Sequence, residues 1–161
     1  FLQQIFRAAT PKTITSIVEA TTQLKEKGWG ALIVIQRETG LRSYKDQGMQ
    51  IRGEVTPSLL LSIFSPSSPL HDGAVIIQND LIDSAACILP LTESKMIDSE
   101  MGTRHRAAIG ISEETDAIVI IVSEEKSKVS VAENGKFVKR NLRESTLEKY
   151  LNDKMFISTE D

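Results

Sequence analysis

Two arginines flank a histidine at Arg104-His105-Arg106, directly after Thr103 and before apolar residues at helical spacing. Threonine is a common N-cap, so we expect Thr103 to cap a helix whose first turn contains both arginines. Cations are normally disfavoured at a helix start, where the dipole is positive and free N–H groups attract anions. Two arginines there predict a bound anion, and their forked donors suit phosphate. A solvated basic cluster, or salt bridges to nearby carboxylates, is the alternative interpretation.

A second candidate group, His71-Asp72-Gly73, precedes an apolar run over residues 74–78. If this run is a strand, Asp72 is held on a rigid element, where its carboxylate can bind a metal ion or accept a hydroxyl proton. Gly73 would let a ligand approach the backbone. Taken singly, an Asp-Gly pair more often marks a turn. A loop histidine such as His71 likewise more often makes a structural hydrogen bond than binds a metal.

A third candidate, Ser123-Glu124-Glu125, follows the apolar run 117–122. The carboxyl end of a central strand is where α/β sheets commonly receive ligands. The alternative is that the two glutamates begin a solvated loop together with Lys126 and Lys128. No Walker-type loop, Gly-x-Gly-x-x-Gly motif or zinc-spaced Cys/His cluster is present, which disfavours classical NTPase, Rossmann and zinc chemistry.

The composition bounds the class of protein around these groups. The chain has 161 residues, of which 40% are hydrophobic and 25% charged, as expected for one soluble domain. Its 19 basic and 22 acidic side chains give a net charge of −3, so nothing global favours nucleic acid. Cys87 is the sole cysteine, which excludes an intrachain disulfide and favours a reducing compartment such as the cytoplasm.

Short apolar runs and turn signals predict the elements that must position the candidate groups. The runs 31–35, 74–78 and 117–122 indicate strands buried on both faces. Turn residues predict two hairpins, over 74–89 around Asn79-Asp80 and over 129–138 around Asn134-Gly135. Helices are expected over 14–27 between Thr10-Pro11 and Gly28, after Thr56-Pro57, after Thr103, and around 147–155.

Strands buried on both faces require helices on both sides, and hairpins require antiparallel pairs. The sequence therefore predicts an α/β fold: a single domain with a mixed parallel and antiparallel central sheet flanked by helices on both faces. We expect this domain to occupy residues 11–156, with residues 1–10 as a lead from a missing transmembrane region and 157–161 as a tail. The first ten and last five residues should be loosely attached. The longest apolar run is too short to span a bilayer.

Asp72-Gly73-Ala74 and Arg104-His105-Arg106 together resemble the paired signature of diadenylate cyclase (DAC) domains. The similarity covers about residues 14–140 and is strongest over residues 30–41, 65–77 and 103–125. These stretches resemble the membrane-anchored bacterial branch of the family. The resemblance implies a DAC-like α/β fold that condenses two ATP molecules into cyclic di-3′,5′-AMP, with release of two pyrophosphates and with Mg²⁺ or Mn²⁺ as cofactor.

The family's motifs also imply roles for particular residues. Asp72 would bind the metal or activate the 3′-hydroxyl, Gly73 would lie against the nucleotide, and His71 is a further metal contact. The residues that would hold the triphosphate are Thr103, Arg104, His105 and Arg106. The family pattern places Leu89 and Ser123 near adenine and Glu125 near the phosphates or the metal. Two ATP molecules in opposite orientations imply a face-to-face homodimer.

Further expectations follow from the branch of the family. The resemblance implies a full-length protein at the cytoplasmic face of the membrane, of which this chain is a soluble fragment. It also implies a membrane regulator and phosphoglucosamine mutase as partners and no nucleic acid. Ile88 departs from the pattern, because membrane-anchored relatives usually have Tyr there, so aromatic stacking on adenine cannot form at this position.

Two other functions stay open alongside the cyclase. The chain could be a non-catalytic sensor that binds adenine nucleotides without pairing productively. It could also be a metal-dependent phosphodiesterase, which would use Asp72 and the cations but would need a larger cluster of metal ligands. Incubation with ATP and Mn²⁺ distinguishes the three functions. A cyclase forms cyclic dinucleotide, and a sensor leaves ATP unchanged. A phosphodiesterase forms AMP when cyclic dinucleotide is added.

Overall fold

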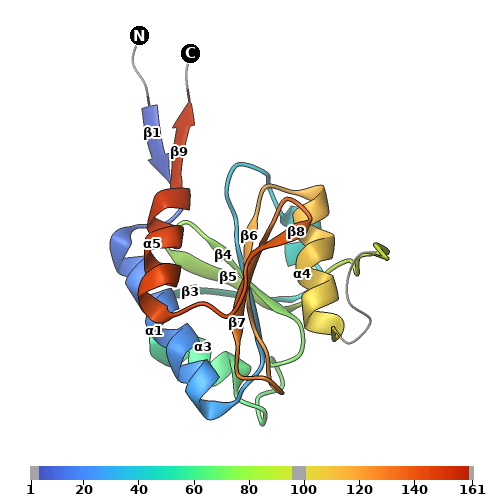
Figure 1. Cartoon of the computed structure of the whole chain (residues 1–161). Helices are drawn as coiled ribbons and strands as arrows, with labels where there is room; N and C mark the ends of the chain where they lie inside the picture. Colours follow the sequence, from blue (N-terminus) through green and yellow to red (C-terminus); the bar gives the residue numbers. More distant parts are fainter. Residues whose placement is uncertain (1–3, 96–100, 160–161) are drawn as a thin grey trace.

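A central sheet runs through the structure, with helices on both of its faces (Figure 1). The structure is a computed structural model, and it describes residues 4–95 and 101–159. In chain order the elements are β1 (Gln4–Arg7), α1 (Pro11–Lys27), β2 (Ala31–Ile35), α2 (Arg42–Lys45), β3 (Met49–Glu54), α3 (Pro57–Phe64), β4 (Ala74–Gln78), β5 (Leu81–Cys87), α4 (Thr103–Glu114), β6 (Ile118–Val122), β7 (Val129–Glu133), β8 (Lys136–Lys139), α5 (Glu144–Lys154) and β9 (Phe156–Thr159).

The central sheet is mixed, as predicted. In the described part of the chain its strands lie in the order β3-β5-β4-β2-β6-β7-β8. β2 and β4 run parallel, and the other neighbouring pairs are antiparallel. Both predicted hairpins are confirmed, and Asn79, Asn134 and Gly135 at their turns have positive φ, as tight hairpin turns favour.

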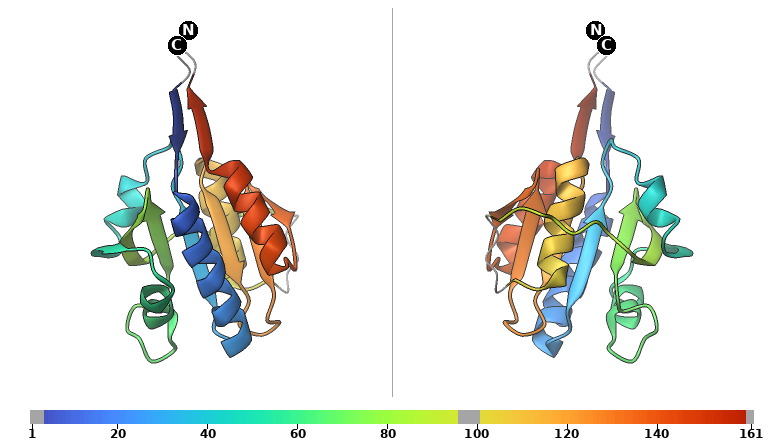
Figure 2. Two further views of the ribbon diagram at one scale, coloured as in Figure 1. Left: turned by 90° about the vertical axis from the view of Figure 1, so that its left-hand side faces the viewer. Right: turned by 90° about the vertical axis from the view of Figure 1, so that its right-hand side faces the viewer.

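Alternate residues of the central strands enter two separate cores. β2 and β6 are buried along their whole length, which is why their sequences are unbroken apolar runs. One core, which includes Ile33, Ile120 and Leu24, lies under α1, α3 and α5. The other, which includes Val34, Ile121 and Ile109, lies under α4. Figure 2 shows α1 and α5 over one face and α4 over the opposite face, so helices flank both faces as predicted.

Most helix boundaries agree with the capping signals. Thr10 caps α1 by accepting a hydrogen bond from the Thr13 N–H, and Gly28 ends that helix in the left-handed conformation with φ 70°. Thr56 caps α3 in the same way through the Leu59 N–H. The prediction that Thr103 caps α4 is wrong, because Thr103 is the first helical residue and Gly102 is the N-cap, with no side-chain hydrogen bond. The two arginines nevertheless lie in the first turns of this helix.

Three other features differ from the prediction. The ends of the chain were expected to be loosely attached, but β1 pairs with β9 in an antiparallel ribbon that projects from the domain (Figure 1). α2 and the edge strand β3 were not predicted. β5 ends at Cys87 rather than at residue 89, so Ile88 and Leu89 lie in the segment that follows it. Among the described residues, no helix combines the length and the apolar character needed to cross a membrane.

The segment that follows β5 crosses the outer side of α4, as the right-hand view of Figure 2 shows. The Thr92 N–H donates to the Arg106 carbonyl at 3.1 Å. At Gly110 a Cβ would lie 1.8 Å from the Pro90 carbonyl oxygen, so only glycine permits this approach. The crossing segment is therefore held against the helix that carries the candidate anion site.

Replacing Gly110 with alanine tests this packing. Alanine normally favours a helix over glycine by about 1 kcal/mol, but here its methyl group would force the crossing segment away from α4. We expect Gly110→Ala to lower the free energy of unfolding by about 1–3 kcal/mol, measured by denaturant titration. Gly40→Ala is the matched control, because a Cβ there meets nothing within 4 Å. Equal stability of the two variants would contradict the packing.

Candidate functional site

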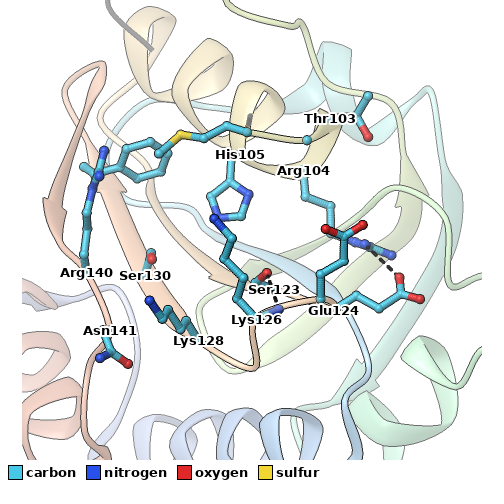
Figure 3. Close-up of a pocket in the computed structure, with 14 residues that line it drawn as sticks. Thr103, Arg104, His105, Ser123, Glu124, Lys126, Lys128, Ser130, Arg140 and Asn141 are labelled. Atoms are coloured by element: carbon cyan, nitrogen blue, oxygen red, sulfur yellow. Dashed lines mark hydrogen bonds and ion pairs between the residues drawn. The ribbon is translucent and has the colours of Figure 1, made fainter. Parts of the chain in front are cut away.

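A pocket of about 340 Å³ opens where the start of α4 meets the turn between β6 and β7 (Figure 3). Its lining residues come from 101–105, 123–126, Lys128, Ser130, Phe137, Arg140 and Asn141. Figure 1 shows the start of α4 and the β6–β7 turn at the end of the domain away from the β1–β9 ribbon. Elements far apart in the sequence therefore meet at one end of the sheet.

The pocket brings together half of the predicted site residues. Those that line it are Thr103, Arg104, His105, Ser123 and Glu125. Those that do not line it are His71, Asp72, Gly73, Leu89 and Arg106. The motif at the start of α4 and the residues after β6 thus form one site, while the Asp72 motif lies beside it.

Arg104 is positioned by packing against the backbone that precedes β2. A Cβ at Gly30 would lie 2.4 Å from the Arg104 Cζ, so the guanidinium occupies space that any other residue at position 30 would need. Arg104 Nη1 also lies 3.3 Å from Glu124 Oε2, and the Glu124 side chain is 62% exposed. Such an exposed ion pair contributes little stability. A phosphate can therefore replace Glu124 as the partner of Arg104 at small cost.

The Asp72 motif lies at the same end of the sheet. β2 and β4 are parallel, with Ile33 opposite Val75. If this register is followed three residues towards the start of both strands, Asp72 comes to lie beside Gly30. His71 Nδ1 lies 2.7 Å from the Ser68 carbonyl oxygen, which can only accept, so Nδ1 donates the hydrogen bond. His71 Nε2 then faces Asp72 Oδ1 at 3.5 Å.

Gly73 and Leu89 have structural roles in the chain itself. Gly73 has φ 101°, and a Cβ there would lie 2.8 Å from the Ala86 carbonyl carbon, so the neighbouring strand β5 already requires glycine. Leu89 is 7% exposed and belongs to the core under α4. Ile88, in contrast, is 69% exposed beside it. The roles that the resemblance gives to Gly73 and Leu89 stay predictions.

Ser123 organises the turn between β6 and β7. Its N–H donates to the Lys128 carbonyl at 2.9 Å, and its Oγ accepts from the Lys126 N–H at 3.3 Å. These two bonds close the turn that borders the pocket, and Figure 3 shows the one between Ser123 and Lys126. The side chains of Lys126 and Lys128 therefore start from an ordered backbone.

His105 projects into the pocket from the first turn of α4 (Figure 3). Its ring meets the Phe137 ring edge-on, with 5.7 Å between centroids. Burial lowers the pKa of His105 below its ordinary value of 6.5, and the positive charges of Lys126, Arg140 and Arg104 lower it further. The neutral imidazole is therefore favoured, and three cations lie close enough to act on it.

Part of the basic lining is not predicted by the sequence. The sequence favours Lys126 and Lys128 as members of a solvated loop with the two glutamates, and no motif marks Arg140. In the structure all three line the pocket together with Arg104. Four cationic side chains thus face two carboxylates, Glu124 and Glu125. Residues 123–128 contain two acidic and two basic side chains, so no local excess of charge in the sequence marks Lys126 and Lys128 as pocket residues.

The residues beside the pocket fit a divalent cation that is shared with a phosphate ligand. No group of three or more His, Cys, Asp or Glu side chains poised for a metal occurs in the part of the chain that the structure describes. Mg²⁺, however, is commonly held by one or two carboxylates together with substrate phosphates. The exposed Asp72 carboxylate supplies such an oxygen donor. His71 Nε2 is the ring nitrogen left for a metal, because Nδ1 is bonded to a backbone carbonyl.

A positively charged pocket at a helix start, at one end of a mixed sheet covered by helices, defines an α/β domain suited to an anionic ligand. The family model described as "DisA bacterial checkpoint controller nucleotide-binding" matches residues 18–137. The chain therefore belongs to the DAC family of nucleotide-binding domains.

Comparison with individual proteins agrees with this assignment. The chain is 48% identical over 153 residues to the cyclic di-AMP synthase CdaA of Bacillus subtilis, covering 95% of this chain and 56% of the relative. It is 45% identical over 138 residues to a diadenylate cyclase of Listeria monocytogenes, covering 86% of this chain and 50% of the relative. The chain thus spans about half the length of the curated relatives it matches.

Solved structures show the same fold. A double mutant of DacA from Staphylococcus aureus superposes with a TM-score of 0.86 at 43% identity, covering 88% of this chain and 94% of that one. A hypothetical membrane spanning protein from Bacillus cereus gives a TM-score of 0.76 at 47% identity, covering 80% and 63% of the two chains. The predicted DAC-like fold is confirmed.

The electrostatic surroundings of His105 can be measured directly, because the chain has two histidines. We expect the His105 ring signals in a proton NMR titration, assigned with His105→Gln, to give a pKa below 6.5. Since the folded state then binds fewer protons than the unfolded state just below pH 6.5, His105 lowers the free energy of unfolding as the pH falls through this range.

Removing a neighbouring charge should reverse part of this shift. Lys126→Gln should move the pKa of His105 upward, whereas Lys139→Gln, an exposed β8 cation outside the pocket lining, should not. A His105 pKa at or above 6.5, or the same pKa in both variants, would show that the cations do not act on this ring.

Proposed function

We propose that this chain is the catalytic domain of a diadenylate cyclase, which condenses two ATP molecules into cyclic di-3′,5′-AMP and releases two pyrophosphates. The observation that carries the proposal is the positively charged pocket at the start of α4, with the His71–Asp72 pair at the same end of the sheet. The names of the relatives, a cyclic di-AMP synthase and a diadenylate cyclase, support it.

The proposed reaction forms and breaks one phosphorus–oxygen bond at each nucleotide. The 3′-oxygen of one ATP attacks the α-phosphorus of the other, the bond to pyrophosphate breaks, and the hydroxyl proton passes to Asp72. Thr103 and Arg104 hold the triphosphate at the helix start, where free N–H groups and the dipole stabilise negative charge. Neutral His105 donates a hydrogen bond to a phosphate oxygen. Arg106 does not line the pocket, and its part in ordering the triphosphate stays a prediction from the resemblance.

A divalent cation, Mg²⁺ or Mn²⁺, is the proposed cofactor. It would neutralise charge on the phosphate oxygens during the displacement. Asp72 Oδ1 and His71 Nε2 are the donors that would hold it, and the remaining positions would be left to phosphates and water. Glu125 lines the pocket, and we propose that its carboxylate lies near the phosphates or the metal.

Two protomers are needed in this proposal, since each nucleotide supplies both an attacking oxygen and an attacked phosphorus. One chain offers the helix start of α4 once, so the second ATP must come with a second chain, paired face to face. Asp72 is 88% exposed, as a group that meets a nucleotide on another protomer must be. Ser123 and the segment of Leu89 would border adenine, with the exposed Ile88 as an aliphatic contact.

The proposal extends to the full-length protein, which would lie at the cytoplasmic face of the membrane. The solved relative from Bacillus cereus, a hypothetical membrane spanning protein, supports this location. A membrane regulator and phosphoglucosamine mutase are the partners proposed from the resemblance to the family.

Replacing Asp72 with asparagine separates chemistry from binding. With ATP and Mn²⁺ or Mg²⁺ the unchanged chain should form cyclic di-AMP, followed by chromatography. Asp72→Asn should reduce product formation by roughly 10²-fold or more, because it removes the proton acceptor and a metal oxygen. ATP affinity should stay largely intact, because the side chains proposed to bind the triphosphate line the pocket and Asp72 does not.

The control is Asp153→Asn, which removes an exposed carboxylate from α5. Turnover retained in Asp72→Asn would remove this residue from its assigned role. Unchanged ATP in the presence of the unsubstituted chain would favour the nucleotide sensor instead, and AMP formed from added cyclic di-AMP would favour a phosphodiesterase.

Pairing of protomers predicts a concentration dependence. We expect the rate of product formation per protomer to rise with protein concentration and to level off when dimers dominate, as followed by product assay and sedimentation. A constant rate per protomer in demonstrably monomeric preparations would rule out the two-protomer site.

A further inference from the structure

Three cationic side chains of the pocket have no role in the function proposed above. Lys126 and Lys128 come from the β6–β7 turn, and Arg140 follows β8. All three line the pocket, and Figure 3 shows Arg140 on the side of the pocket opposite Arg104. This basic arm, defined as Lys126, Lys128 and Arg140, continues the positive lining beyond the helix start.

Arg140 and the backbone that carries the two lysines are held by contacts within the chain. Arg140 lies over the Phe137 ring, with Cζ 5.0 Å from the centroid, and the same ring meets His105 edge-on. Phe137 therefore sets the place of Arg140 relative to the start of α4. On the other side, the two hydrogen bonds of Ser123 close the turn that carries both lysines.

The cations of the pocket outnumber its two carboxylates, Glu124 and Glu125. Other cations of the chain have acidic partners, such as Lys12 with Glu54 and Lys154 with Glu133. Among the side chains that the structure describes, no ion pair joins Lys126, Lys128 or Arg140 to a carboxylate. Three like charges near one another raise the free energy of the empty pocket, and a bound polyanion would offset that cost.

We propose that Lys126, Lys128 and Arg140 bind the β- and γ-phosphates of ATP and hold the pyrophosphate as it leaves. This inference rests on the proposed function, which puts the triphosphate at the helix start, and it adds that the α-phosphate is the part held there. The tail of the triphosphate extends from Thr103 and Arg104 along the pocket, where it meets the arm. The arm makes the pocket selective for nucleoside triphosphates over monophosphates, and it makes inorganic pyrophosphate a competitor of ATP.

Binding without turnover tests the arm. ATP and AMP are titrated calorimetrically in EDTA, so that no product forms. In Lys126→Gln/Lys128→Gln/Arg140→Gln we expect ATP affinity to fall by roughly tenfold or more, the scale of hydrogen bonds to charged groups. AMP affinity should stay unchanged, and inorganic pyrophosphate should compete with ATP less well than in the unsubstituted chain.

Lys136→Gln/Lys139→Gln/Lys149→Gln is the matched control, because it removes three positive charges outside the pocket lining. It should keep the preference for ATP over AMP. Equal loss of ATP and AMP affinity in the arm variant, or an equal loss of ATP affinity in the control, would overturn the inference. Unfolding curves of both variants check that the fold is kept.

The outcomes also separate this inference from the function on which it rests. If the unsubstituted chain makes cyclic di-AMP and the arm variant keeps the full preference for ATP, the arm inference alone fails. If the unsubstituted chain binds no adenine nucleotide, both fail. If it binds ATP selectively through the arm but forms no cyclic dinucleotide, the arm stands and the cyclase proposal fails.

Discussion

The pocket depends on the packing of Arg104 against the backbone of Gly30. A cation in the first turn of a helix is repelled by the helix dipole and would ordinarily turn toward solvent. Here the guanidinium lies where a Cβ of residue 30 would be, so glycine at this position lets Arg104 pack against the backbone just before β2. β2 is buried on both faces, which makes this support rigid. The contact between Arg104 of α4 and Gly30 therefore positions the guanidinium at the pocket.

Local charge, rather than the charge of the whole chain, decides what the pocket attracts. Exposed charges act over a Debye length of about 8–10 Å at moderate salt, so most of the acidic surface is screened from the pocket. Inside it, Arg104 and the basic arm face Glu124 and Glu125. The lowered pKa of His105 has the same origin, because burial and the surrounding cations oppose an additional positive charge. A net charge of −3 is therefore compatible with a site for a polyanion.

The buried strands and the Arg104 motif were predictable because each has a short-range signature: an unbroken apolar run, or cations at a helix start. The edge strand β3 (Met49–Glu54) was not predictable from the sequence, because it is largely exposed and has little apolar periodicity. The N-cap was misassigned because Thr103 and Gly102 are both acceptable caps, and only backbone geometry distinguishes them. Lys126 and Lys128 could not be placed, because a lysine in a turn has the same local sequence whether it faces solvent or a pocket. The β1–β9 pairing joins opposite ends of the chain, which no local pattern reveals.

The separation of Asp72 from the pocket bears on the proposed reaction. In a catalytic site formed by one protomer alone, the carboxylate that accepts the proton would lie among the side chains that hold the substrate. Here the carboxylate is 88% exposed and outside the pocket, while the groups for the triphosphate are inside it. Gly73 is held by the approach of β5, so the position of Asp72 does not depend on a ligand. An exposed carboxylate on a fixed backbone, outside the pocket, suits a reaction whose attacking oxygen and attacked phosphorus belong to different nucleotides, because it can serve a nucleotide that a second protomer presents.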